Sequence, residues 1–114
     1  MAMFRFMHIG FMFPGVPKIR DLEPVITRIG DWIRYSPMSW IVWTDKLSAE
    51  IFIIIRPHLD PQDQVLIVSL NALDSFGSLS PWIWNWVNSK MRSVVTGEEV
   101  QNLLLTPPPP PKGY

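Results

Sequence analysis

The sequence predicts an α+β fold, in which a four-stranded antiparallel sheet carries two crossover helices on one face, in the order β-α-β-β-α-β. Two observations predict this order. Apolar and aromatic runs typical of strands occur at residues 3–13, 32–44 and 64–70, the second long enough for a hairpin. Helical signals fall between the first and second runs and between the second and third. At 114 residues the chain is large enough for a single core.

The first strand and helix are predicted from residues 3–34. Residues 3–13 are rich in Phe, Met and Ile, as expected of a central strand buried on both faces. "FPGVPK" breaks this strand. From Asp21 the apolar residues recur at helical spacing, with Pro24 in the first turn and Gly30 placed to end the helix. The residues at this spacing are Leu22, Val25, Ile26, Ile29 and Ile33.

The second crossover is the ambiguous element. "IFIIIRPHLD" (51–60) contains an uninterrupted apolar run that is typical of a buried strand. A strand there would leave no crossover between "SWIVWT" (39–44) and "QVLIVSL" (64–70). We therefore predict a helix from Ser48 to about Leu59, with Pro57 tightening or ending its last turn. Its inward face would hold Ala49, Phe52, Ile55 and Leu59.

The β-α-β-β-α-β order is the split βαβ or ferredoxin-like arrangement. The C-terminal third adds further segments to it. Ser80 and Pro81 resemble the N-cap and first position of an extra helix over 82–90. We expect a ferredoxin-like domain at 1–91, a C-terminal arm at 92–106 and an extended polyproline tail at 107–114.

The composition excludes several kinds of site and segment. Basic and acidic residues number 10 each, so a nucleic-acid surface would have to be a local patch, and copies of the chain repel one another little. The absence of cysteine excludes disulfides and thiolate metal sites and fits a cytoplasmic location. No segment reaches the roughly 20 apolar residues of a membrane span, and Arg5 and His8 interrupt the apolar start that would otherwise resemble a signal peptide.

Three sequence segments carry a family resemblance: "SWIVWTDKLSAE", "RPHLDPQDQVLIVSLNA" and "WNWVNS". They resemble small bacterial proteins described as SinR-like, which carry "TWLIKTD…SAE", "KPHLDxxDxLLVxxL" and "DWL". These proteins are similar to the second core Cas protein of CRISPR adaptation and to VapD-type ribonucleases. The resemblance covers roughly residues 3–90. It implies a homodimer formed by bringing two ferredoxin-like sheets together, with nucleic-acid scaffolding or metal-dependent nuclease activity.

The chain departs from that family at the catalytic position. In the nucleases the first strand ends in an acidic residue, and two such carboxylates across the dimer can hold Mg²⁺. The matching segment here is "MHIGFMF" (7–13), in which His8 and Gly10 are the nearest candidates. Neither replaces a carboxylate on magnesium, so we predict no catalytic residue, no metal site and no cofactor. Mg²⁺ would be required only if relocated carboxylates formed a small endonuclease.

Several polar residues are candidates for a site, each with a structural alternative. His8 is a general base, a soft-metal ligand or a hydrogen-bonded polar residue at a strand end. His58, Asp60 and Asp63 either bind a divalent cation or build the turn of "RPHLDPQD". Asp45 either takes part in catalysis or complements the dipole of the helix that follows it.

The remaining candidates are surfaces. Basic residues interleaved with aromatic ones in the first third of the chain are candidate nucleic-acid contacts, or else an ordinary solvated surface: Arg5, Lys18, Arg20, Arg28 and Arg34. Ile53, Ile54, Trp82 and Trp84 lie off the predicted inward faces. They form a candidate interface, unless the C-terminal arm covers them.

Three functions follow from these features. The leading one is a homodimeric ferredoxin-like binding or scaffold protein without the nuclease centre. The others are a small metal-dependent endonuclease and an adaptor that docks a protein partner through its Ile/Trp surface or its tail.

Overall fold

The fold was analysed in a computed structural model, which describes the backbone of residues 3–94 and the side chains of residues 3–92. The predicted arm from residue 95 onward and the polyproline tail lie outside the described residues. Two compact units are present, Met1–Leu70 and Asn71–Tyr114. Each unit is described by itself.

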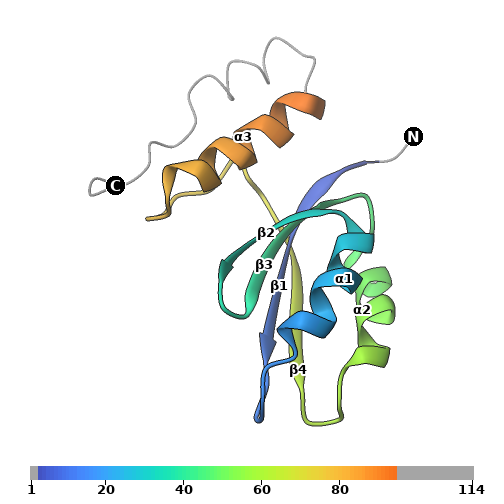
Figure 1. Cartoon of the computed structure of the whole chain (residues 1–114). Helices are drawn as coiled ribbons and strands as arrows, with labels where there is room; N and C mark the ends of the chain where they lie inside the picture. The colour runs from blue at the N-terminus through green and yellow to red at the C-terminus, as the bar shows by residue number, and fades with distance from the viewer. Residues whose placement is uncertain (1–2, 95–114) are drawn as a thin grey trace. The chain divides into compact units, whose positions relative to one another are not determined.

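The first unit has the predicted order of elements (Figure 1). Its strands are β1 (Arg5–Met12), β2 (Asp31–Ser36), β3 (Ser39–Thr44) and β4 (Gln64–Leu70). Its helices are α1 (Ile19–Ile29) and α2 (Ser48–Ile55), followed by the 3-10 turn η1 (Arg56–His58). The strands form one sheet in the order β2-β3-β1-β4, and every neighbouring pair is antiparallel. The predicted ferredoxin-like α+β fold is confirmed.

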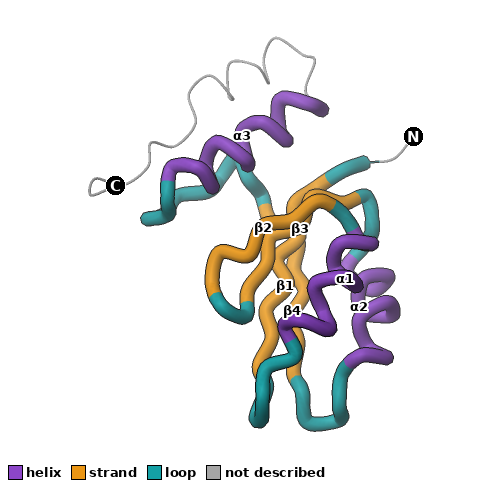
Figure 2. The backbone as a smooth tube through the Cα atoms, in the orientation of Figure 1, coloured by secondary structure: helices purple, strands orange, loops and turns teal. Residues whose placement is uncertain are grey.

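Both helices lie on one face of this sheet (Figure 2). α1 packs against β2 and β3, whereas α2 packs against β4, so the two helices divide the sheet between them. Alternate residues of the strands point into this layer because side chains alternate across a strand. The core that results consists of Met7, Ile9, Phe11, Leu22, Val25, Ile26, Ile29, Trp40, Val42, Ile51 and Ile55.

α1 ends where β3 leaves no room for a side chain. Gly30 caps the helix, and its N–H donates to the Ile26 carbonyl over 3.3 Å. A Cβ at Gly30 would lie 2.1 Å from the carbonyl oxygen of Trp43, far inside contact distance. Thr44, which is fully buried, donates from Oγ1 to the Ile29 carbonyl over 2.8 Å and ties the same helix end to β3. Glycine is therefore required here by the close approach of two backbones.

The helical prediction at Ile51 is confirmed, and its inward face is correct at Ile55 and Leu59 but wrong at Ala49 and Phe52. Ile51 and Ile55 are fully buried, whereas Phe52 is 41 % exposed. The N-cap is Leu47, so Glu50 occupies the third helical position and accepts the Leu47 N–H over 3.2 Å. Ser48 is consequently the first helical residue. Pro57 lies in the 3-10 turn, and the predicted tightening of the last turn is correct.

The described part of the second unit is a loop followed by α3 (Pro81–Val94). Asn71 begins the loop as an Asx-turn, in which its Oδ1 accepts the Leu73 N–H over 3.1 Å. The helix begins at Pro81 as predicted and runs past Lys90. Ile83 and Trp84 are its buried residues, while Trp82 is 55 % exposed.

Candidate interaction surface on the sheet

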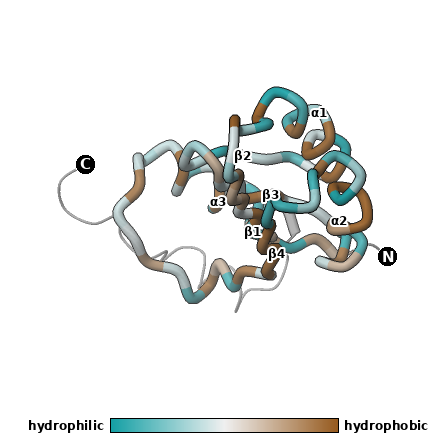
Figure 3. Tube along the Cα trace, turned by 90° about the horizontal axis from the view of Figure 1, so that it is seen from below, coloured by the Kyte–Doolittle hydropathy of each residue, from teal (hydrophilic) through white to brown (hydrophobic). Residues whose placement is uncertain are grey.

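The sheet of the first unit has a second face that carries no helix of this unit, and we refer to it as the outer face. β4 contributes Leu66, Val68 and Leu70 to it, because Val65 and Ile67 point to the helical layer. These three side chains are 61 %, 38 % and 37 % exposed. Figure 3 shows hydrophobic residues along β4. A strand whose solvent-exposed side chains are largely apolar presents a surface suited to contact with another surface rather than with solvent.

A polar pair lies on the same face, between β1, which neighbours β4, and β2 at the opposite edge of the sheet. His8 of β1 and Tyr35 of β2 form a hydrogen bond, with 2.6 Å between Nε2 and the phenol oxygen. Tyr35 belongs to the irregularity of β2 between Arg34 and Ser36. Gly10 and Ser39 are opposite each other on β1 and β3, and a Cβ at Gly10 would lie 3.0 Å from His8. The small residues give the imidazole its room.

Burial lowers the pKa of His8 below its ordinary value, because desolvation disfavours the imidazolium. The ring is therefore neutral at neutral pH and is hydrogen bonded to Tyr35. His8 is therefore a hydrogen-bonded polar residue, as one alternative predicted, but it lies in the middle of β1 and not at a strand end.

Among residues 3–94, β4 is also an edge strand of the sheet, paired with β1 alone. Its seven residues pair with β1 without any register shift, from Phe6 opposite Leu70 to Met12 opposite Gln64. The strand contains no charge and no proline. The opposite edge, β2, carries Asp31 and Arg34 and the irregularity at Tyr35. Charges and bulges are the usual protection of edge strands, so β2 is protected and β4 is not.

A groove of about 290 Å³ runs between α2 and β4. It is lined by Ser48, Ala49, Phe52, Val65 and Ile67. Its walls are mostly apolar. The wall formed by Ser48 and Ala49 is shallow because their side chains are small. The exposed ring of Phe52 therefore borders a cavity at the unprotected edge of the sheet.

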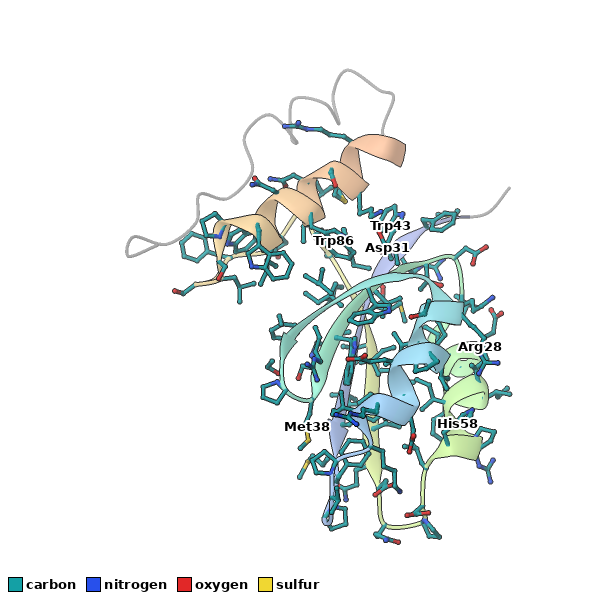
Figure 4. All side chains as sticks on the ribbon, viewed as in Figure 1. Arg28, Asp31, Met38, Trp43, His58 and Trp86 are labelled. Atoms are coloured by element: carbon teal, nitrogen blue, oxygen red, sulfur yellow. The ribbon has the colours of Figure 1, made fainter. Side chains whose placement is uncertain are left out.

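The three residues His58, Asp60 and Asp63 do not form a metal site. Asp63 accepts the Asp60 N–H over 2.8 Å and orients the turn before β4, as the structural alternative predicted. Lys18, from the β1–α1 connection, donates to Asp60 over 2.5 Å and also to Asp63. His58 lies beside the end of α2 in η1 (Figure 4). Among residues 3–94, no group of three or more His, Asp or Glu side chains is arranged to hold a metal ion.

The Lys18 contacts define a pH dependence of stability. Lys18 holds the pKa of Asp63 below its ordinary value, and the hydrogen bonds that Lys18 donates to Asp60 and Asp63 raise the pKa of Lys18. Asp63 thus stabilises the fold above the unfolded carboxyl pKa, and this contribution is lost as the pH falls through its lowered folded value. The Lys18 contribution is present below the unfolded lysine pKa and is lost as the pH rises through its raised folded value.

Replacing Lys18 by Met should lower the melting temperature most at neutral pH, where both groups are charged, because the 4 %-exposed Asp63 side chain then loses its cation. The deficit should shrink at acidic pH, where Asp63 is protonated in wild type and variant alike. Thermal melts of both proteins at neutral and acidic pH measure this. Lys46→Met serves as the matched control. A deficit that stayed constant into acid would contradict the assignment.

The five basic candidates differ in exposure and in the contacts that they make. Arg5 is half-buried at the start of β1, and Lys18 is engaged by two carboxylates. Arg20 and Arg28 are exposed on α1, where Figure 4 shows Arg28, and the Arg34 guanidinium lies 5.9 Å from the centre of the Trp40 ring. Arg34 and Lys18 therefore serve the fold, and nucleic-acid binding by this set stays a prediction.

The four interface candidates differ in exposure. Ile53 is 69 % exposed and Trp82 is 55 % exposed. Ile54 packs against the core, and Trp84 is buried, which corrects the prediction that both lie outside. α3 buries Ile83 and Trp84, whereas Trp86 and Val87 are half-buried.

Sequence reasoning missed Tyr35, Thr44 and the exposed residues of β4. The partners of Tyr35 and Thr44 lie 27 and 15 residues away, so no local pattern reveals them. The β4 residues carried a signal, because "QVLIVSL" is apolar on both alternating sets although only one set can face the helices. Asp45 is exposed in the turn after β3, where the Lys46 N–H bonds to Thr44 Oγ1.

No helix among the described residues is long and apolar enough to cross a membrane. Comparison of the chain with protein-family models, with curated proteins and with solved structures finds no match.

Proposed function

We propose that this protein is a homodimeric binding or scaffold protein without a catalytic centre of its own. One observation carries the proposal, namely the exposed apolar surface of β4, formed by Leu66, Val68 and Leu70. An antiparallel sheet with one solvated face normally alternates apolar and polar residues, so three exposed apolar residues in one strand indicate contact with another chain.

The resemblance to the CRISPR adaptation subunit supports self-association, since that family pairs its ferredoxin-like sheets. The same resemblance places His8 and Gly10 where the nucleases carry their carboxylate. His8 is hydrogen bonded to Tyr35 and Gly10 adjoins the His8 ring, so this position holds a structural pair instead of an oxygen ligand. A scaffold needs a stable surface and no metal, and it fits these residues better than a nuclease does.

Sedimentation of the full-length chain tests the proposal. The wild type should be dimeric at micromolar concentration. Val68→Lys, which puts a charge on the outer face of β4, should shift it to monomer, whereas Val16→Lys, at an 85 %-exposed loop position, should leave the dimer unchanged. A wild type that stays monomeric throughout the micromolar range would exclude the homodimer.

Incubation with RNA and DNA in Mg²⁺ or Mn²⁺ tests the absence of a catalytic centre. We expect no turnover. Metal-dependent cleavage that is lost in Asp45→Ala or Asp60→Ala would contradict the proposal and favour the small endonuclease.

A further inference from the structure

We propose that the second copy docks at the free edge of β4, so that two β4 strands pair antiparallel and two four-stranded sheets become one continuous sheet. This inference rests on the proposed self-association and specifies its geometry. The family resemblance implies that two ferredoxin-like sheets are brought together, without specifying which surfaces meet. The edge of β4, with the groove beside it, supplies that surface.

The unequal edges of the sheet are the first argument. Alternate residues of an edge strand point their backbone N–H and C=O groups away from the sheet, where they can pair with a further strand. β2 discourages such pairing through Asp31, Arg34 and its irregularity. β4 offers seven consecutive residues with no charge, no proline and no irregularity. Only β4 is therefore suited to receive another strand.

The pairing is self-complementary about Ile67, the middle residue of β4. An antiparallel partner related by a two-fold axis through Ile67 uses the whole strand. Leu66 then lies opposite Val68 of the second copy, and Val65 lies opposite its Ser69. Both sets of helices come to the same side, because residues directly opposite each other share a face of the sheet.

The groove beside β4 is the second, independent argument. It lies on the helical side, between Phe52 and the residues Val65 and Ile67. In the paired sheet, Val65 and Ile67 of the second copy continue the same row of side chains and enter this groove. Each copy thus fills the cavity of the other, as an isologous interface requires. The low wall of Ser48 and Ala49 lets the second copy approach.

Charge favours a second copy of this chain over an unrelated partner. β4 brings no charge to the contact, and the chain as a whole has equal numbers of acidic and basic residues. Two copies therefore meet without like-charge repulsion. A strand with acidic or basic side chains would have to desolvate them against Leu66, Val68 and the groove, at a cost that the second copy avoids.

Disulfide scanning tests the geometry directly, because the chain has no cysteine of its own. Single cysteines at each position from Gln64 to Leu70 should cross-link most at Ile67, since residues facing each other across the axis are about 5 Å apart. The ends should not cross-link, because residue 64 of one copy is about 20 Å from residue 64 of the other. A profile without a maximum inside β4 would overturn the edge pairing.

Hydrogen exchange and a matched pair of variants complete the test. Alternate β4 amides should gain protection as the concentration rises, since they are bonded only in the dimer. Ser69→Lys should raise the dissociation constant about tenfold or more, a change of about 1.4 kcal/mol. Ser36→Lys, on the protected edge β2, should have no effect.

The outcomes separate the two proposals. A monomer under all conditions removes both. A dimer that forms without concentration-dependent protection of β4 and tolerates Ser69→Lys leaves the homodimer standing and overturns the edge pairing. Assembly beyond the dimer also overturns it, because a two-fold pairing of β4 closes after two copies.

Discussion

Trp40→Ala should strongly lower the free energy of unfolding. Trp40 is fully buried in β3 and contacts Phe11 edge-on, at 5.4 Å between ring centres, and Trp32 at 6.4 Å. Truncating a buried Trp to Ala costs about 3–5 kcal/mol. Domains of this size are stable by about 5–15 kcal/mol, so the loss removes about a fifth of the total at the least. Urea denaturation followed by far-UV circular dichroism measures it.

Trp40→Phe should cost less than half as much, for a reason specific to this site. The indole Nε1 of Trp40 is buried without a hydrogen-bond partner among the described residues. An unpartnered buried donor costs about 1–3 kcal/mol, and phenylalanine removes that donor while keeping an aromatic ring. Trp82→Ala, at a 55 %-exposed position, is the control and should change stability by about 0.5 kcal/mol or less. Equal losses in Trp40→Ala and Trp82→Ala would contradict the core assignment.

The order of elements could be predicted because it depends on local patterns and chain connectivity. The alternation and β-branched content of "SWIVWT" and "QVLIVSL" specify strands, and the spacing from Leu22 to Ile29 specifies a helix. Where the local pattern was ambiguous, at Ile51–Ile55, the need for a crossover between β3 and β4 decided in favour of a helix. The structure follows that topological constraint.

The inward face of α2 could not be obtained in the same way. Phe52, Ile53, Ile54 and Ile55 are all apolar, so the run has no period, and the face depends only on where the helix begins and how it meets the sheet. Each residue advances about 100° around a helix, and an error of one residue exchanges Ile51 for Phe52 on the core side. The N-cap at Leu47 was also unrecognisable, because leucine has no side-chain acceptor.

The candidate surface includes features that the sequence pattern could predict and contacts that it could not. The exposed residues of β4 follow from strand alternation once the helices are known to cover one face only. The His8–Tyr35 pair and the Lys18 bonds to Asp60 and Asp63 join residues 27, 42 and 45 positions apart. These contacts depend on the irregularity in β2 and on the close packing of two loops, which are properties of the folded chain alone.

Ile51→Ala and Phe52→Ala should therefore separate the core of α2 from its contact surface. Ile51 is fully buried, and its truncation should cost about 2–5 kcal/mol at any protein concentration, because the cavity lies within one copy. Phe52 is 41 % exposed and borders the groove that the second copy would fill. Its truncation should cost little in dilute solution and more as the concentration rises, since dimerisation stabilises the folded state by mass action.

Urea melts of both variants and the wild type, at a low and a high micromolar concentration, measure the difference. A concentration-independent loss for Ile51→Ala together with a concentration-dependent loss for Phe52→Ala is the expected result. The opposite assignment, with Phe52 facing the core as its sequence context suggested, predicts a large and constant loss for Phe52→Ala and a small one for Ile51→Ala. The same pair of adjacent residues thus tests the rotation of the helix and the role of its exposed ring.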